Sequence, residues 1–85
     1  MYQWFPASGG AIPTAASPNG NDVDGAPLFV VRAVVGGSLQ PGKIGPDFGG
    51  ANIPFGGQEL KVADYEVLVN FGHWGVAAGG LVRPT

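Results

Sequence analysis

The 85-residue chain contains no cysteine, a single histidine and few charged side chains. Without cysteine, no disulfide can stabilise so short a domain. The sequence also does not indicate whether the protein resides in an oxidising or a reducing compartment. One histidine without any thiolate argues against a zinc site, so we expect no metal and no other cofactor. Because disulfides and metals are the usual supports of small domains, we expect oligomerisation to supply the missing stability.

Charge and long apolar runs are also scarce. Four basic residues stand against six acidic ones, which argues against a nucleic-acid partner, because binding to phosphates needs several Lys or Arg residues. The longest apolar run, Pro27 to Val35, is too short to span a membrane and carries Arg32. The N-terminus shows no basic region followed by an apolar core. We therefore expect a soluble protein, cytoplasmic or exported by a non-classical route.

Sixteen glycines and eight prolines interrupt the chain too often for helices. The hydrophobic content of 45% is nevertheless too high for a disordered chain. This combination predicts an all-β fold of small antiparallel sheets, with short strands joined by many Gly/Pro turns. Asp24-Gly25 and Gly56-Gly57 are predicted as two-residue hairpin loops with positive φ. The candidate strands cover Met1–Ala7, Pro27–Val35, Ala51–Phe55, Glu59–Val62, Tyr65–Asn70 and Trp74–Ala77.

Catalytic machinery cannot be assembled from these residues, so the sequence predicts a binding module and not an enzyme. No serine or threonine lies in a nucleophile motif that could act with His73, so we interpret His73 as a hydrogen-bonded side chain beside Trp74. Carboxylates for glycoside hydrolysis are present, but nothing in the sequence brings any pair together. These carboxylates belong to Asp47, Glu59, Asp64 and Glu66. A loose calcium site near Asp22 stays open as an alternative.

Four motifs follow one another between Gly20 and Leu68. They read G-N-D-V-D-G-A-P-L-F-V-V-R-A, then P-G-K-I-G-P, then I-P-F-G-G-Q-E, and finally Y-E-V-L. In this order and spacing they resemble the DM9 repeat family, over essentially the whole chain. Val31 stands where the family usually has glycine before the arginine.

The resemblance implies a function that composition does not reveal. Lectin-type DM9 proteins bind mannose and mannose-rich glycans, and the residues that match their sugar-contacting positions are Asp22 and Lys43. A carboxylate accepts charge-assisted hydrogen bonds from vicinal hydroxyls, and an ammonium donates to sugar oxygens. We expect each residue to lie in a glycine-rich loop that a ligand can approach. The alternatives are a turn-capping aspartate and a solvated lysine.

Other side chains are interpreted as structural. Arg32 interrupts an apolar strand and is expected to pair with Glu66 or Glu59 across a sheet. Trp4 and Trp74 are expected in the core or an interface, with stacking on a sugar as the alternative. The core candidates are Phe29, Val30, Phe55 and Leu68.

The two ends of the chain resemble each other. Residues 4–10 match residues 74–80 in the tryptophan, an alanine and a Gly-Gly pair. We therefore treat residues 1–85 as one DM9-like domain, with 72–85 resembling the start of a second repeat. Lectin-type relatives intertwine tandem repeats, so we expect a homodimer that exchanges terminal strands. The leading hypothesis is a mannose-binding lectin. The alternative is a non-catalytic protein-assembly module, or a recognition fragment related to the pore-forming natterin-like proteins.

Overall fold

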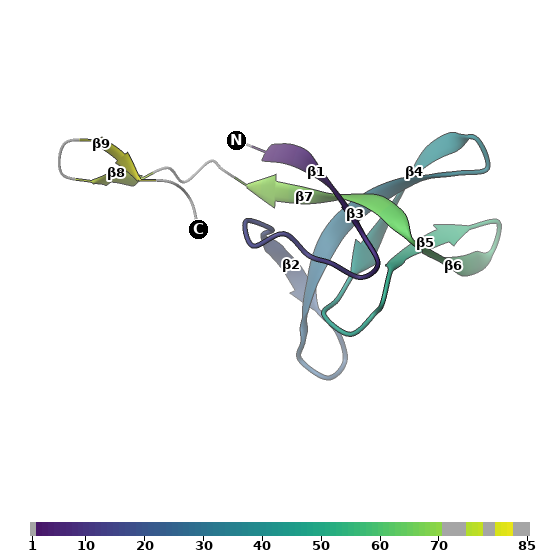
Figure 1. The fold of residues 1–85 in the computed structure, drawn as a ribbon. Coiled ribbons are helices and arrows are strands. Elements are labelled where there is room, and N and C mark those ends of the chain that lie inside the picture. Colours follow the sequence, from purple (N-terminus) through teal and green to yellow (C-terminus); the bar gives the residue numbers. More distant parts are fainter. Residues whose placement is uncertain (1, 71–74, 78–79, 83–85) are drawn as a thin grey trace.

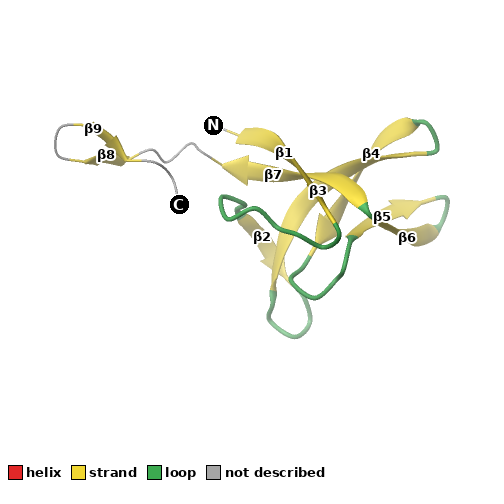
Figure 2. Ribbon diagram, viewed as in Figure 1, coloured by secondary structure: helices red, strands yellow, loops and turns green. Residues whose placement is uncertain are grey.

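The computed structural model of the chain, which describes residues 2–70, 75–77 and 80–82, is built from short β-strands. Figure 2 shows no helix in these segments, so the all-β prediction is confirmed. The strands are β1 (Tyr2–Ser8), β2 (Pro18–Asn21), β3 (Pro27–Val35), β4 (Ser38–Ile44), β5 (Ala51–Phe55), β6 (Gln58–Val62), β7 (Asp64–Asn70), β8 (Gly75–Ala77) and β9 (Gly80–Val82).

Strands β1 to β7 form one antiparallel sheet of seven strands (Figure 1). Its order is β1-β7-β3-β4-β5-β6, and β2 branches from β3. The long strand β3 pairs with β4 along one side, and on the other side it pairs first with β2 and then with β7. Only Ala63 separates β6 from β7, so the chain turns sharply there and crosses from the β6 edge to a position between β1 and β3. Strands β8 and β9 form a separate two-stranded sheet.

Paired glycines make the tight hairpins of this sheet. Gly56 and Gly57 join β5 to β6 with φ values of 60° and 79°, which confirms the predicted two-residue loop. Both values lie in the region that type I′ turns require and that side chains with a Cβ atom avoid. Gly25 also has a positive φ of 87°, but its loop extends from residue 22 to 26. The prediction of a two-residue loop at Asp24-Gly25 was therefore wrong.

One face of the sheet is buried and the other, called here the outer face, is not. Successive side chains of a strand point to opposite faces, so buried Val31 and Ala33 of β3 place Arg32 on the outer face, and buried Tyr65 and Val67 of β7 do the same for Glu66. The core consists of Val31, Ala33, Ile44, Ala51, Ile53, Tyr65, Val67 and Val69.

Two of the four predicted core residues lie on the wrong face. Val30 and Leu68 alternate with buried neighbours and therefore lie on the outer face, half-buried. Phe55 is 37% exposed, and its ring covers the Gly36 turn. Phe29 does pack against the core. In the apolar run of β3 one charged residue, Arg32, marks the outer face, and Val30 shares that face because it lies two residues away.

The predicted strands match the structure closely, with three strands missed. The bounds of β3 and β5 agree with the sequence prediction, and those of β1, β6 and β7 differ by one residue at one or both ends. Strands β2, β4 and β9 were not predicted. In β4, Pro41 and Gly42 suggested a loop, but β4 pairs with β5 only at Lys43 and Asn52. At Pro41 the side of β4 that faces β5 therefore behaves like an edge, where no backbone amide donor is needed and proline is tolerated. The predicted strand at Trp74–Ala77 appears as β8, and both Trp74 and His73 lie outside the described residues.

Tyr65 ties the loop after β1 to the core. Its hydroxyl donates a hydrogen bond of 2.8 Å to the carbonyl of Ala11, far away in the sequence. Burial raises the pKa of Tyr65 above the ordinary value of 10.0, and a hydrogen bond from the Gly10 backbone opposes the rise. The neutral hydroxyl is thus the form that the folded chain prefers.

We predict that Tyr65→Phe lowers the free energy of unfolding at pH 7 by about 1 kcal/mol, because the Ala11 carbonyl loses its donor. The folded pKa lies above the unfolded one, so the contribution of the hydroxyl is present below pH 10 and is lost as the pH rises through the folded pKa. Urea unfolding of both proteins at pH 7 and above pH 10 measures this. Parent and variant should converge in the alkaline range, and a constant difference would contradict the assignment.

Candidate functional site

Lys43 lies on the outer face of the sheet and borders an open cavity. It belongs to β4, where it stands opposite Val30 of β3 and Asn52 of β5. The cavity has a volume of about 360 Å³ and is lined by Pro41, Gly42, Lys43, Pro54 and Glu59. Lys43 was expected in a glycine-rich loop, and its position on a strand corrects that expectation.

The Lys43 cavity carries one positive and one negative side chain that do not pair with each other. The Lys43 ammonium forms neither a hydrogen bond nor an ion pair within the described segments. Glu59 accepts a hydrogen bond of 3.3 Å from the amide of Asn52 through Oε1. The nearby ammonium of Lys61 is instead bonded to the carbonyl of Phe48. A free donor and a partly free acceptor therefore face the same space.

Gly42 forms a bare backbone wall of this cavity. A Cβ atom at this position would lie 2.2 Å from the Asn52 carbonyl oxygen and 2.6 Å from Cδ1 of Ile53. Only glycine lets β4 approach β5 this closely. The close approach brings Lys43 beside Asn52, so the residue before the lysine is part of what positions it.

Asp22 lies in the loop between β2 and β3, as expected. The loop is tightly bonded: the Asp22 amide donates to the Ala26 carbonyl at 2.8 Å, and the Gly25 amide donates to the Asp22 carbonyl at 2.9 Å. Oδ1 of Asp22 accepts from the Val23 amide at 2.8 Å, so the carboxylate caps its own turn. Asp22 does not line the Lys43 cavity, because β3 lies between β2 and β4.

Arg32 and Glu66 form the ion pair that the sequence suggested. Arg32 Nε lies 2.7 Å from Glu66 Oε1, across β3 and β7. The Arg32 guanidinium also lies 4.2 Å from the centre of the Trp4 ring, a cation–π contact that holds the indole on the outer face. Of the two expected partners the arginine takes Glu66, and Glu59 stays with Asn52.

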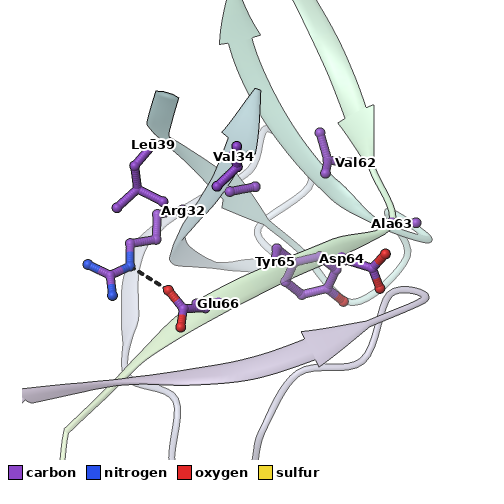
Figure 3. Close-up of a pocket in the computed structure, with 9 residues that line it drawn as sticks. Arg32, Val34, Leu39, Val62, Ala63, Asp64, Tyr65 and Glu66 are labelled. Atoms are coloured by element: carbon purple, nitrogen blue, oxygen red, sulfur yellow. Dashed lines mark hydrogen bonds and ion pairs between the residues drawn. The ribbon is translucent and has the colours of Figure 1, made fainter. Parts of the chain in front are cut away.

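A second cavity opens beside this ion pair, where β3 and β7 stop pairing (Figure 3). It has a volume of about 480 Å³, and two exposed apolar side chains border it, Val34 and Leu39, which are 68% and 51% exposed. No local motif predicted this cavity, because it forms where β3, β4, β6 and β7 come together from separate parts of the sequence. The lining consists of Arg32, Ala33, Val34, Leu39, Val62, Ala63, Asp64, Tyr65 and Glu66.

Among the four carboxylates considered for catalysis, Asp64 and Glu66 line one cavity. Glu66 is held by Arg32, while Glu59 borders the Lys43 cavity. Over the described segments, no three His, Cys, Asp or Glu side chains are grouped as metal ligands. Within the same segments no helix is long and apolar enough to cross a membrane.

Comparison with known families gives one result. The model of the DM9 repeat matches residues 1–62 and again residues 22–85, so the two matches together extend over the whole chain. A search of curated proteins found no match.

We predict that Gly42→Ala lowers the free energy of unfolding by about 1–3 kcal/mol, because the new methyl group collides with backbone in a packed sheet. Ser38→Ala is the matched control, since Ser38 is exposed on the same strand and such changes cost roughly 0.5 kcal/mol or less. Urea unfolding compares the two variants. If Gly42→Ala were as stable as the control, the close approach of β4 to β5 would not hold.

Proposed function

Because the chain belongs to the DM9 repeat family, we propose that it is a lectin for mannose or mannose-rich glycans, with no catalytic activity. The family supports a carbohydrate-binding or recognition module, and the preference for mannose is our proposal. The observation that carries it is the Lys43 cavity, where an ammonium that has no partner among the described residues borders the same open space as a carboxylate.

A sugar matches this arrangement because each hydroxyl both donates and accepts hydrogen bonds. The Lys43 ammonium has three donors for sugar oxygens. Asp22 keeps Oδ2 for a hydroxyl, because its other oxygen, Oδ1, already accepts from the Val23 amide. Hydrogen bonds of this kind are charge-assisted and therefore stronger than neutral ones. A single monosaccharide buries little surface, so one site should bind in the micromolar to millimolar range, roughly −8 to −4 kcal/mol.

The positions of Asp22 and Lys43 favour a ligand larger than one sugar. Lys43 lies on β4 and the Asp22 loop follows β2, with β3 between them. Two strand spacings amount to roughly 10 Å. We therefore assign Lys43 to one mannose unit and Asp22 to a neighbouring unit of an extended or branched glycan.

We predict that Lys43→Ala weakens binding of both methyl α-mannoside and a mannose-rich oligosaccharide by about tenfold or more, because a charge-assisted partner is lost. Asp22→Ala should weaken the oligosaccharide more than the monosaccharide. Titration calorimetry measures both ligands, and thermal melts confirm folding.

Asp24→Ala is the matched control for the Asp22 variant. Its carboxylate bonds the Ala26 amide within the same loop, so it reports what loosening the loop does by itself. Equal losses in the Asp22 and Asp24 variants would show that Asp22 acts by shaping the loop. Unchanged mannose affinity in Lys43→Ala would place the site elsewhere.

We also propose that the protein works as a homodimer. Strand β1 pairs with β7 along residues 2–8, and residues 74–80 resemble residues 4–10, which include most of β1. A partner's terminal segment could therefore take the place of β1 on β7. Exchange of this kind joins two weak sites, and simultaneous binding raises the strength on a branched glycan.

The dimer predicts a mass in solution of about twice the 8.6 kDa of one chain. Light scattering after size-exclusion chromatography at micromolar concentration measures it, with mannoside binding assayed on the same peak. A mass of 8.6 kDa with sugar binding intact would contradict the dimer but leave the lectin in place.

The second candidate function is a protein-assembly module, possessing no sugar site. It is favoured by the exposed Val34 and Leu39 beside the larger cavity, because exposed apolar patches often mark protein contacts. A glycan array separates the two functions: a mannose-selective pattern supports the lectin, and silence across the array favours assembly.

A further inference from the structure

We propose that Glu59 is a second sugar-contacting residue of the Lys43 cavity, and that its charge makes the site select neutral over acidic saccharides. This inference rests on the proposed lectin function. Glu59 lies at the start of β6, and it lines the same cavity as Lys43 of β4, with β5 between the two strands. The acidic partner that shares the Lys43 cavity is thus Glu59 and not Asp22.

The bonding of Glu59 leaves it ready for a ligand. Asn52 of β5 donates to Oε1, which holds the carboxylate over the strand. Oε2 has no bond to any described residue. Lys43 is equally free on the other side of the cavity, and the two side chains form no ion pair with each other. Each of them is therefore available to a molecule that fits between them.

Lys43 and Glu59 border the same cavity but stand on strands separated by β5, so two hydroxyls at different positions of one sugar ring complete this pair of charges. One hydroxyl donates its proton to Glu59 Oε2, and the other accepts a proton from the Lys43 ammonium, so both bonds are charge-assisted. Pro41 and Pro54 line the cavity between them and offer apolar surface to the C–H face of a sugar ring. Gly42 contributes only backbone to the lining, and its close approach to Asn52 holds β4 and β5 together beneath the cavity.

The same pair of charges discriminates between ligands. Lys43 by itself would attract an acidic sugar. Lys61, on the same strand as Glu59, adds a second positive charge to this attraction. A carboxylate on the ligand would, however, stand close to the carboxylate of Glu59, and like charges at short range repel each other. Rejection of a competing ligand by an unfavourable charge is a common source of specificity. A neutral sugar satisfies both side chains without this penalty.

Two ligands that differ only at C6 test the inference: methyl α-mannoside and the corresponding mannuronate. Titration calorimetry is performed with the parent protein, Glu59→Gln, Lys43→Ala and the control Asp47→Asn. Glu59→Gln keeps the size of the side chain and removes the charge. Asp47 is exposed and does not line the cavity, so its variant reports the effect of one charge on the whole protein.

The parent should bind the mannoside more tightly than the mannuronate. In Glu59→Gln the mannoside affinity should fall about tenfold, while the mannuronate affinity should hold or rise, so that the preference disappears. Asp47→Asn should behave like the parent. If Lys43→Ala loses mannoside binding while Glu59→Gln keeps both the affinity and the preference of the parent, the role of Glu59 is overturned and the lectin stands. If the parent binds neither ligand nor any glycan of the array, the lectin and this inference fail together.

Discussion

The burial of a single face of the main sheet is the constraint on which the rest of this structure depends. The chain has 85 residues and no cysteine, so the apolar contacts among Val31, Ile44, Ile53, Val67 and their neighbours must hold the fold together. Because side chains alternate along each strand, every buried residue of this set fixes the opposite orientation for the residue beside it. The core thereby determines which side chains the outer face presents.

The outer face acquires its chemistry from this alternation. Lys43 precedes buried Ile44, Asn52 lies between buried Ala51 and Ile53, and Glu66 lies between buried Tyr65 and Val67. The outer face therefore carries two pairs of charged side chains, of which one forms an ion pair and the other does not. Arg32 and Glu66 neutralise each other and hold Trp4, so they stabilise the sheet. Lys43 and Glu59 share a cavity without pairing. The same type of charge pair is thus structural in one place and available to a ligand in the other.

The strands and turns could be predicted from the sequence more completely than the candidate site. The apolar run of β3 and the Gly56-Gly57 turn have local causes, and both were predicted correctly. In β3, Arg32 alone distinguishes the outer face, and Val30, which shares that face, was wrongly predicted in the core. Strand β4 was missed because Pro41 and Gly42 are unfavourable in most strands, and only the geometry at β5 shows why they are tolerated here. The meeting of Lys43 with Glu59 depends on the register of three strands, which no local pattern encodes.

The position of the site on strands, instead of on loops, has a consequence for recognition. Side chains anchored on paired strands need little ordering when a ligand binds, so less of the binding free energy is spent on fixing them. Gly42 strengthens this effect, because it allows β4 to pack directly against the Asn52 backbone. The Asp22 loop reaches a similar order by a different route, through hydrogen bonds within the loop. A site with fixed charges discriminates by where the charges of the ligand fall, since it cannot move away from an unfavourable one. In such a site the Glu59 carboxylate, which forms no ion pair among the described residues, matters as much for the ligands that it rejects as for those that it binds.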